Sequence, residues 1–117
     1  LHSTRFHLKF KTTINPEIVL QKFEQNPFIA NTNKFDSNQI FELGRRYGKY
    51  GRIYNHCILV ENNLLFTENS VKGWAFIPQE GNSIISTIHA FLLQVYGVDF
   101  ANNRIEKIKN QLLISKL

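Results

Sequence analysis

Four histidines and a single cysteine are the side chains that could carry acid–base, nucleophilic or metal chemistry: His2, His7, His56, His89 and Cys57. Their spacing matches no zinc motif, so we expect no metal site. His56 and Cys57 are neighbours in a segment typical of a strand, and adjacent strand residues point to opposite faces. They therefore cannot pair as catalytic base and nucleophile, and we interpret Cys57 as a small buried apolar residue.

His2 differs from the other histidines because it stands at the entrance of a strand, where catalytic groups often lie. In the strand pattern from Leu1 to Phe10, Phe6, Leu8 and Phe10 alternate with His7, Lys9 and Lys11, which predicts a strand with one buried face. From spacing alone, a structural role remains the simpler interpretation of His2. We interpret His7, on the polar face of this strand, and His89, within a helix, as structural histidines.

The segment from Arg45 to Arg52 places four cations and two aromatic rings within eight residues. Cations interleaved with stacking rings suit single-stranded nucleic acid. The simpler interpretation, which we favour, is a solvated helix C-terminus followed by a loop at a subunit contact, because cations complement the helix dipole there. A net charge of +5 spread along the chain is only weak evidence for nucleic-acid binding.

The length of 117 residues predicts one domain over residues 1–117. Hydrophobic periodicity and capping residues predict strands over 1–10, 28–30, 52–60, 64–67 and 71–77, and helices over 16–26 and 37–47. They also predict a long helix with apolar residues from Ile84 to Val95 and a final helix, capped at Asp99, that carries Ile105, Ile108 and Leu112. The last three strands, separated by short turns, predict a meander. The order β-α-β-α-β-β-β-α-α predicts an α+β fold, a mostly antiparallel sheet with helices packed on one face.

Composition narrows the class of protein further. A hydrophobic content of 43% with ten phenylalanines is typical of a globular domain. No apolar run approaches the roughly 20 residues of a membrane helix, so we expect no membrane partner. One cysteine excludes an internal disulfide and fits a reducing compartment, which favours the cytoplasm. Because the sequence opens directly in a strand pattern, we expect it to be the second half of a larger protein.

From Leu1 to about Leu93 the sequence resembles the C-terminal part of the archaeal-type (class II) glyceraldehyde-3-phosphate dehydrogenases. Leu1-His2 before an alternating strand resembles the segment that delivers the catalytic histidine of that family. Further similar segments follow in the family's order: 16–27, 37–48 with Gly44-Arg45-Arg46-Tyr47-Gly48, 53–60, and Gln79-Glu80 before a helix. Pro78, where a polar residue is expected, and the tail from Val98 depart from the pattern.

The resemblance implies the catalytic and oligomerisation portion of a glycolytic oxidoreductase, cytoplasmic and homotetrameric, that oxidises a phosphorylated aldehyde with NAD or NADP. An upstream cysteine thiolate would attack the aldehyde, hydride would pass to the cofactor, and phosphate would release the acyl group. His2 would be the general base that activates the thiol. Gln79 and Asn82, with Glu80 between them, would border the nicotinamide.

No glycine-rich dinucleotide fingerprint occurs in the sequence, so the resemblance places a nucleotide-binding domain before Leu1. The chain alone is therefore predicted to be inactive. Two alternatives stay open: a small basic module that binds RNA or a ribonucleoprotein through Arg45 to Arg52, and a relative of the dehydrogenases that keeps the fold without the catalysis.

Overall fold

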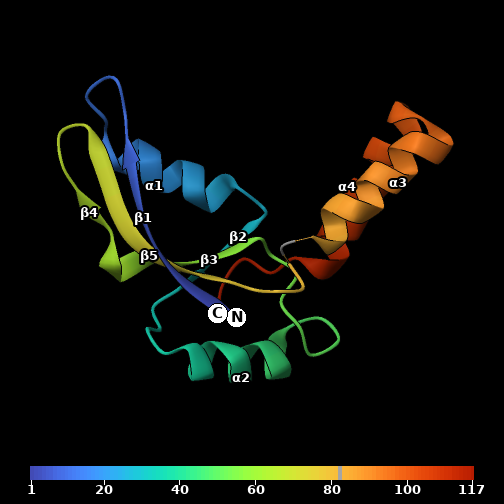
Figure 1. The fold of residues 1–117 in the computed structure, drawn as a ribbon, viewed down its shortest axis with the longest axis horizontal. Helices are drawn as coiled ribbons and strands as arrows, with labels where there is room; N and C mark the ends of the chain where they lie inside the picture. Colours follow the sequence, from blue (N-terminus) through green and yellow to red (C-terminus); the bar gives the residue numbers. More distant parts are fainter. Residues whose placement is uncertain (82) are drawn as a thin grey trace.

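The computed structural model describes residues 1–81 and 83–117. Within these residues a five-stranded sheet has the order β1-β5-β3-β2, with β4 paired to β5. The strands are β1 (His2–Lys9), β2 (Ile29–Thr32), β3 (Cys57–Val60), β4 (Leu65–Phe66) and β5 (Ser70–Ile77). The helices are α1 (Pro16–Gln25), α2 (Ser37–Tyr47), α3 (Ile84–Tyr96) and α4 (Val98–Leu112), with a 3-10 turn, η1 (Glu61–Asn63) (Figure 1). The predicted α+β class and the order of the elements are confirmed.

The long strand β5 organises the sheet. Along one edge it pairs antiparallel with all of β1, from His2 opposite Ile77 to Lys9 opposite Ser70. Its other edge is shared by β4 and β3, both antiparallel to it. β3 and β4 therefore run in the same direction, and the expected meander is wrong, because η1 displaces the chain sideways without reversing it.

The far side of the sheet is parallel. β2 pairs in parallel with β3, and α2 forms the crossover between them. The C-terminal residues then add to the outer edge of β2: the Asn31 amide donates to the Ser115 carbonyl at 2.9 Å, and the Leu117 amide donates to the Asn31 carbonyl at 2.9 Å. The end of the chain thus protects an edge that would otherwise offer unpaired backbone groups.

Side-chain caps begin the first two helices, as the sequence predicts. Asn15 accepts a hydrogen bond from the Glu17 amide, and Pro16 fills the first helical position, where a missing amide hydrogen costs nothing. Asp36 accepts from the Asn38 amide at 2.7 Å. These caps fix where the chain leaves the strand layer and turns into each helix.

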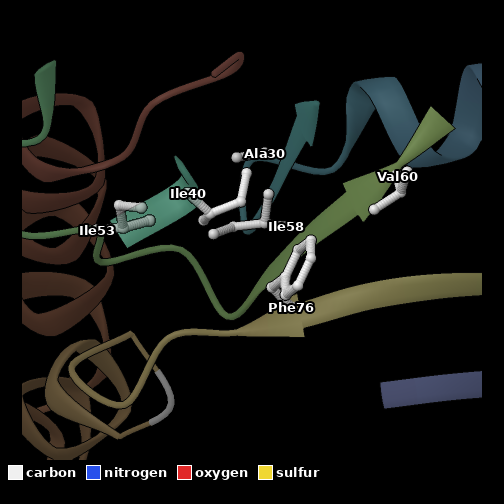
Figure 2. Close-up of a cluster of buried hydrophobic side chains, with 6 residues drawn as sticks. All are labelled: Ala30, Ile40, Ile53, Ile58, Val60 and Phe76. Carbon is white, nitrogen blue, oxygen red and sulfur yellow. The ribbon is translucent and has the colours of Figure 1, made fainter. Parts of the chain in front are cut away.

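Apolar residues lie on both faces of the sheet, so the helices are not gathered on one face as expected. One face contributes to a buried cluster that α2 covers, drawn in Figure 2: Ala30, Ile40, Ile53, Ile58, Val60 and Phe76. The other face buries Leu59, Val71 and Ala75, and α1 lies on that side of the sheet (Figure 1). α3 and α4 pack mainly against each other in a hairpin that projects away from the sheet (Figure 1).

The fully buried Asn55 ties together distant parts of the chain. Its side-chain amide donates to the carbonyls of Pro27 at 3.1 Å and Ile114 at 2.8 Å, and its Oδ1 accepts from the Ile114 amide at 3.2 Å. The next two amides, of His56 and Cys57, both donate to the Phe28 carbonyl. These bonds hold residues 52–56 as a loop, so the strand predicted from residue 52 begins only at Cys57.

Replacing Asn55 with alanine should lower the free energy of unfolding by about 2–4 kcal/mol, because it removes three hydrogen bonds and leaves buried backbone groups without partners. Urea denaturation followed by the fluorescence of Trp74 measures the loss. Asn103→Ala, which truncates an exposed asparagine of α4, should change the same quantity by no more than about 0.5 kcal/mol. Equal effects of the two variants would contradict the role given to Asn55.

Candidate functional site

The strand register brings two of the three predicted site residues, His2 and Gln79, to the same end of the sheet. Because His2 lies opposite Ile77 in the β1–β5 pair, it stands at the end of the sheet where β5 gives way to Pro78 and Gln79. Both His2 and Gln79 are exposed there. The third predicted residue, Asn82, lies outside the residues that the structure describes.

A cavity of about 90 Å³ adjoins this end of the sheet. Four segments line it: Leu1 before β1, one face of α2, the loop 51–53, and the segment 78–80 that follows β5. Leu1, not His2, contributes to the lining, and neighbouring residues of an extended chain point to opposite sides. The imidazole of His2 therefore lies on the other side of the strand from this cavity, which Gln79 lines, so the two side chains do not share it.

An ion pair joins two walls of the cavity. The Arg52 guanidinium Nε lies 3.0 Å from Glu80 Oε1, and both side chains are partly exposed. A pair in that setting contributes only about 0–1 kcal/mol to stability. Its consequence is geometric, since it holds the segment after β5 against the loop that follows α2.

Gly81 makes the tightest backbone contact of this region. A Cβ atom on Gly81 would lie 1.7 Å from the carbonyl oxygen of Asn55, so the close approach requires glycine. The contact seats the segment 78–80 directly on the loop that Asn55 anchors. The wall that carries Gln79 and Glu80 is thus fixed by backbone packing as well as by the ion pair.

The remaining histidines and the cysteine lie apart from this end of the sheet. His89 Nε2 is 3.1 Å from Asn102 Oδ1 between α3 and α4, a structural contact. Burial raises the pKa of the Cys57 thiol to about 11, so it stays protonated at neutral pH and is a poor nucleophile. In the described part of the chain, no three His, Cys, Asp or Glu side chains gather where they could hold a metal ion.

His56 lies in the loop just before β3. Its ring stacks on Phe28 with centroids 4.2 Å apart, and its Nε2 is buried without a hydrogen-bond partner. Burial lowers the pKa of this imidazole below its ordinary value near 6.5. His56 is therefore a packing residue that is neutral at pH 7.

The cation-rich segment forms an exposed surface at the end of α2. Tyr47 is 67% exposed and Tyr50 is 89% exposed. Two of the four cations are engaged in ion pairs: Arg46 Nε lies 2.9 Å from Glu42 Oε1, and Arg52 pairs with Glu80. The tyrosine rings are open to a partner, whereas the charge available to bind anions is partly neutralised.

Comparison with known proteins finds no protein-family model that matches the chain and no curated protein that matches it. In the residues that the structure describes, no helix has the length and apolar character needed to cross a membrane.

Sequence reasoning missed the two contacts that shape the region, the Arg52–Glu80 ion pair and the hydrogen bonds of Asn55. One signal for Asn55 was present, since asparagine is disfavoured in strands and here interrupts an otherwise apolar and aromatic run from Ile53 to Val60. The ion pair left no signal, because its partners lie far apart in the sequence.

His56 should make stability depend on pH in the mildly acidic range. Its pKa is lowered in the folded state, so the unfolded chain takes up the proton more readily, and stability present above about pH 6.5 is lost as the pH falls below that value. In His56→Phe, the decrease in the free energy of unfolding between pH 7.5 and pH 5.5 should be smaller than in the parent protein. Urea denaturation at both pH values measures it.

The matched control is His2→Gln, which removes an exposed histidine and should keep the parent's decrease. An unchanged decrease in His56→Phe would show that burial of this ring does not govern the acid sensitivity.

Proposed function

We propose that this chain is the C-terminal catalytic and oligomerisation portion of an NAD(P)-dependent phosphorylating aldehyde dehydrogenase, similar to the archaeal-type glyceraldehyde-3-phosphate dehydrogenases. The observation that carries the proposal is the β1–β5 register. It places His2, at the entrance of β1, beside the segment after β5 that carries Gln79. The resemblance assigns these two residues to one active site, although they lie at distant points of the sequence.

In this proposal His2 moves the proton. Its exposed imidazole would accept the proton of a cysteine thiol supplied by the part of the protein before Leu1, and would polarise the aldehyde oxygen. The position of the imidazole, on the side of β1 away from the small cavity, leaves it open to such an upstream segment. Cys57 is not that nucleophile, because its buried thiol stays protonated.

The cofactor would be held mainly outside this chain. The cavity beside the proposed site measures about 90 Å³, well below the roughly 300–1,000 Å³ of ordinary ligand pockets. This cavity therefore cannot enclose a dinucleotide, and an upstream domain would bind NAD or NADP. Gln79 and Glu80 would form part of the wall that faces the nicotinamide.

His2→Ala should lower kcat by about 10²–10⁴-fold in the native polypeptide that contains this sequence, because a general base of the reaction is lost. The assay follows NAD(P)H formation from glyceraldehyde 3-phosphate in the presence of phosphate. The melting temperature should stay within about 2 °C of the parent value, since His2 is exposed and surface changes rarely exceed about 0.5 kcal/mol.

His7→Ala removes the other histidine of β1 and should leave kcat within about twofold of the parent value. A variant at His2 with normal turnover, or a parent polypeptide without dehydrogenase activity, would refute the catalytic proposal. The second result would favour a relative that kept the fold and lost the chemistry.

A second candidate function is a surface for single-stranded nucleic acid at the end of α2. The observation that favours it is the exposure of Tyr47 and Tyr50 beside Arg45 and Lys49, which are exposed as well. Exposed rings flanked by cations can stack on unpaired bases while the cations contact phosphates.

Fluorescence anisotropy with a labelled oligouridylate tests this candidate. Binding through the surface should weaken with salt, and Arg45→Ala combined with Lys49→Ala should reduce the slope of log K against log salt by about 1.4, or 0.7 for each phosphate that no longer meets a cation. The matched control, Lys107→Ala with Arg104→Ala on α4, should leave the slope unchanged. The absence of salt-sensitive binding at micromolar protein would eliminate the candidate.

A further inference from the structure

Strand β1 lies at an open edge of the sheet. β5 pairs with one side of β1, and among the residues that the structure describes no strand pairs with its other side (Figure 1). Phe6 is half-buried, and all the remaining residues of this eight-residue strand are exposed. An open edge presents a row of backbone amide and carbonyl groups with which another extended chain can pair. β1 therefore offers a position for a further strand.

The register of β1 shows which of its backbone groups face outward. The Phe10 amide donates to the Asn69 carbonyl at 2.8 Å, one step beyond the pair of Lys9 with Ser70. In an antiparallel pair, residues that exchange hydrogen bonds alternate with residues that do not. The even-numbered residues of β1 therefore bond to β5, and the odd-numbered residues direct their amides and carbonyls away from the sheet. The outward groups belong to Ser3, Arg5, His7 and Lys9.

The odd-numbered residues also make one face of this edge positive. Alternate side chains of a strand share a face, so Arg5 and Lys9 lie on the same side, together with Lys72 of β5, which is opposite His7. In the described part of the chain, none of these three cations takes part in an ion pair. Partial desolvation, and then the charges of Lys72 and Lys9, lower the pKa of His7 below its ordinary value of 6.5, so its ring is largely neutral at pH 7. The charges that a partner would meet along β1 are those of Arg5 and Lys9.

The opposite face of β1 is apolar and only partly covered. Phe6, Leu8 and Phe10 share it, and Leu8 is 43% exposed and Phe10 36%. Alternation of this kind ordinarily accompanies a buried face, but here a neighbouring strand covers these side chains from one side alone. A strand added beside β1 would cover them from the other side if its own apolar residues shared that face.

We propose that β1 binds an extended peptide segment of a partner protein in which acidic and apolar residues occupy alternate faces. The segment would pair antiparallel with β1 and extend the sheet by one strand. Residues directly opposite each other share a face, so two carboxylates four residues apart would lie beside Arg5 and Lys9, with Cβ atoms about 4.5–5.5 Å apart in each pair. The apolar residues of the segment would pack beside Phe6 and Leu8.

Charge selects an acidic segment over a second copy of this chain. Two β1 strands paired with each other would bring Arg5 and Lys9 of one copy against the same cations of the other, and like charges directly opposite are destabilising. A net charge of +5 also opposes self-association and attracts acidic partners. An acidic segment instead gains two pairs of opposite charge. This inference does not rest on the dehydrogenase proposal, because it uses no residue assigned to catalysis, and the two can fail separately.

Fluorescence anisotropy with the labelled and end-capped peptide VEVTVEV tests the proposed surface. Paired antiparallel with β1, this peptide sets its glutamates opposite Arg5 and Lys9 and its threonine opposite His7. The 117-residue chain should bind it, and Arg5→Glu combined with Lys9→Glu should weaken binding by about tenfold or more, because two attractive pairs become repulsive. The charge-reversed peptide VKVTVKV should bind this double variant more tightly than it binds the parent chain.

The matched control is Arg104→Glu combined with Lys107→Glu, two exposed positions of α4. It changes the net charge by the same amount and should leave the affinity for VEVTVEV within about twofold of the parent value, because charges beyond a Debye length are largely screened. Both double variants should keep the circular dichroism spectrum of the parent chain. A control that weakens binding as much as the substitutions in β1 would show that net charge alone attracts the peptide and would overturn the proposal.

Methylated peptides separate strand addition from charge attraction. In the proposed pairing the glutamate amides donate to carbonyls of β1, whereas the amides of the valines between them point away. N-methylation of both glutamates should therefore abolish binding, and N-methylation of the two inner valines should preserve it. Equal binding of the two methylated peptides, or no binding of VEVTVEV, would overturn the proposal. So would a chain that dimerises through this edge, as shown by a dimer mass in light scattering that Arg5→Glu with Lys9→Glu returns to 13.7 kDa.

Discussion

The hydrogen bonds of Asn55 are the constraint on which the rest of the structure depends. One buried side chain binds the turn at Pro27 and the C-terminal segment at Ile114. Its own carbonyl lies against Gly81, which leads from β5 into α3. The edge of β2, the end of the chain and the base of the projecting hairpin are therefore held at one point. A polar side chain in a core is stabilising only when its partners are complete, as they are here.

The hydrogen bonds of Asn55 also help to position the candidate site. The sheet register sets His2 at the end of β1, and the contact of Gly81 with Asn55 sets the facing segment that carries Gln79. The Arg52–Glu80 ion pair adds position but little stability, because both side chains are partly exposed. The geometry of the site thus derives from backbone pairing and close packing. Substitutions at its charged residues should change chemistry or binding more than they change folding.

Local patterns in the sequence predicted the elements well, and contacts between distant segments explain the differences. The strand β1 and the caps at Asn15 and Asp36 are properties of neighbouring residues, so they could be predicted. The buried face expected of β1 is wrong, because none of its residues is buried and Leu8 is 43% exposed. The start of β3 could not, because Asn55 draws residues 52–56 toward Pro27 and Ile114. The pairing of both β3 and β4 with the same edge of β5 likewise could not be predicted. It depends on η1, which shifts the chain sideways between these two strands without reversing its direction.

In the candidate site and in α3, too, some features could be predicted from the sequence and others appear only in the structure. The resemblance predicts that His2 and Gln79 belong to one site, and the register brings only their segments to the same end of the sheet, so their roles stay predictions. The ion pair between Arg52 and Glu80 was not foreseen. The apolar character of α3 is evident in its sequence, but periodicity alone does not say which of its stripes α4 covers. Only the packing of Ile85 and Leu92 against α4 shows that the stripe through Phe91 is left open.

The central proposal is that these residues form part of a larger dehydrogenase. The most direct test is the intact mass of the endogenous polypeptide, captured with an antibody against this sequence and measured by mass spectrometry. The account predicts a mass of about 25–36 kDa, the size of a dinucleotide-binding domain of roughly 100–200 residues joined to this one. A mass near 13.7 kDa would contradict it, because no upstream cysteine or nucleotide domain would then accompany His2.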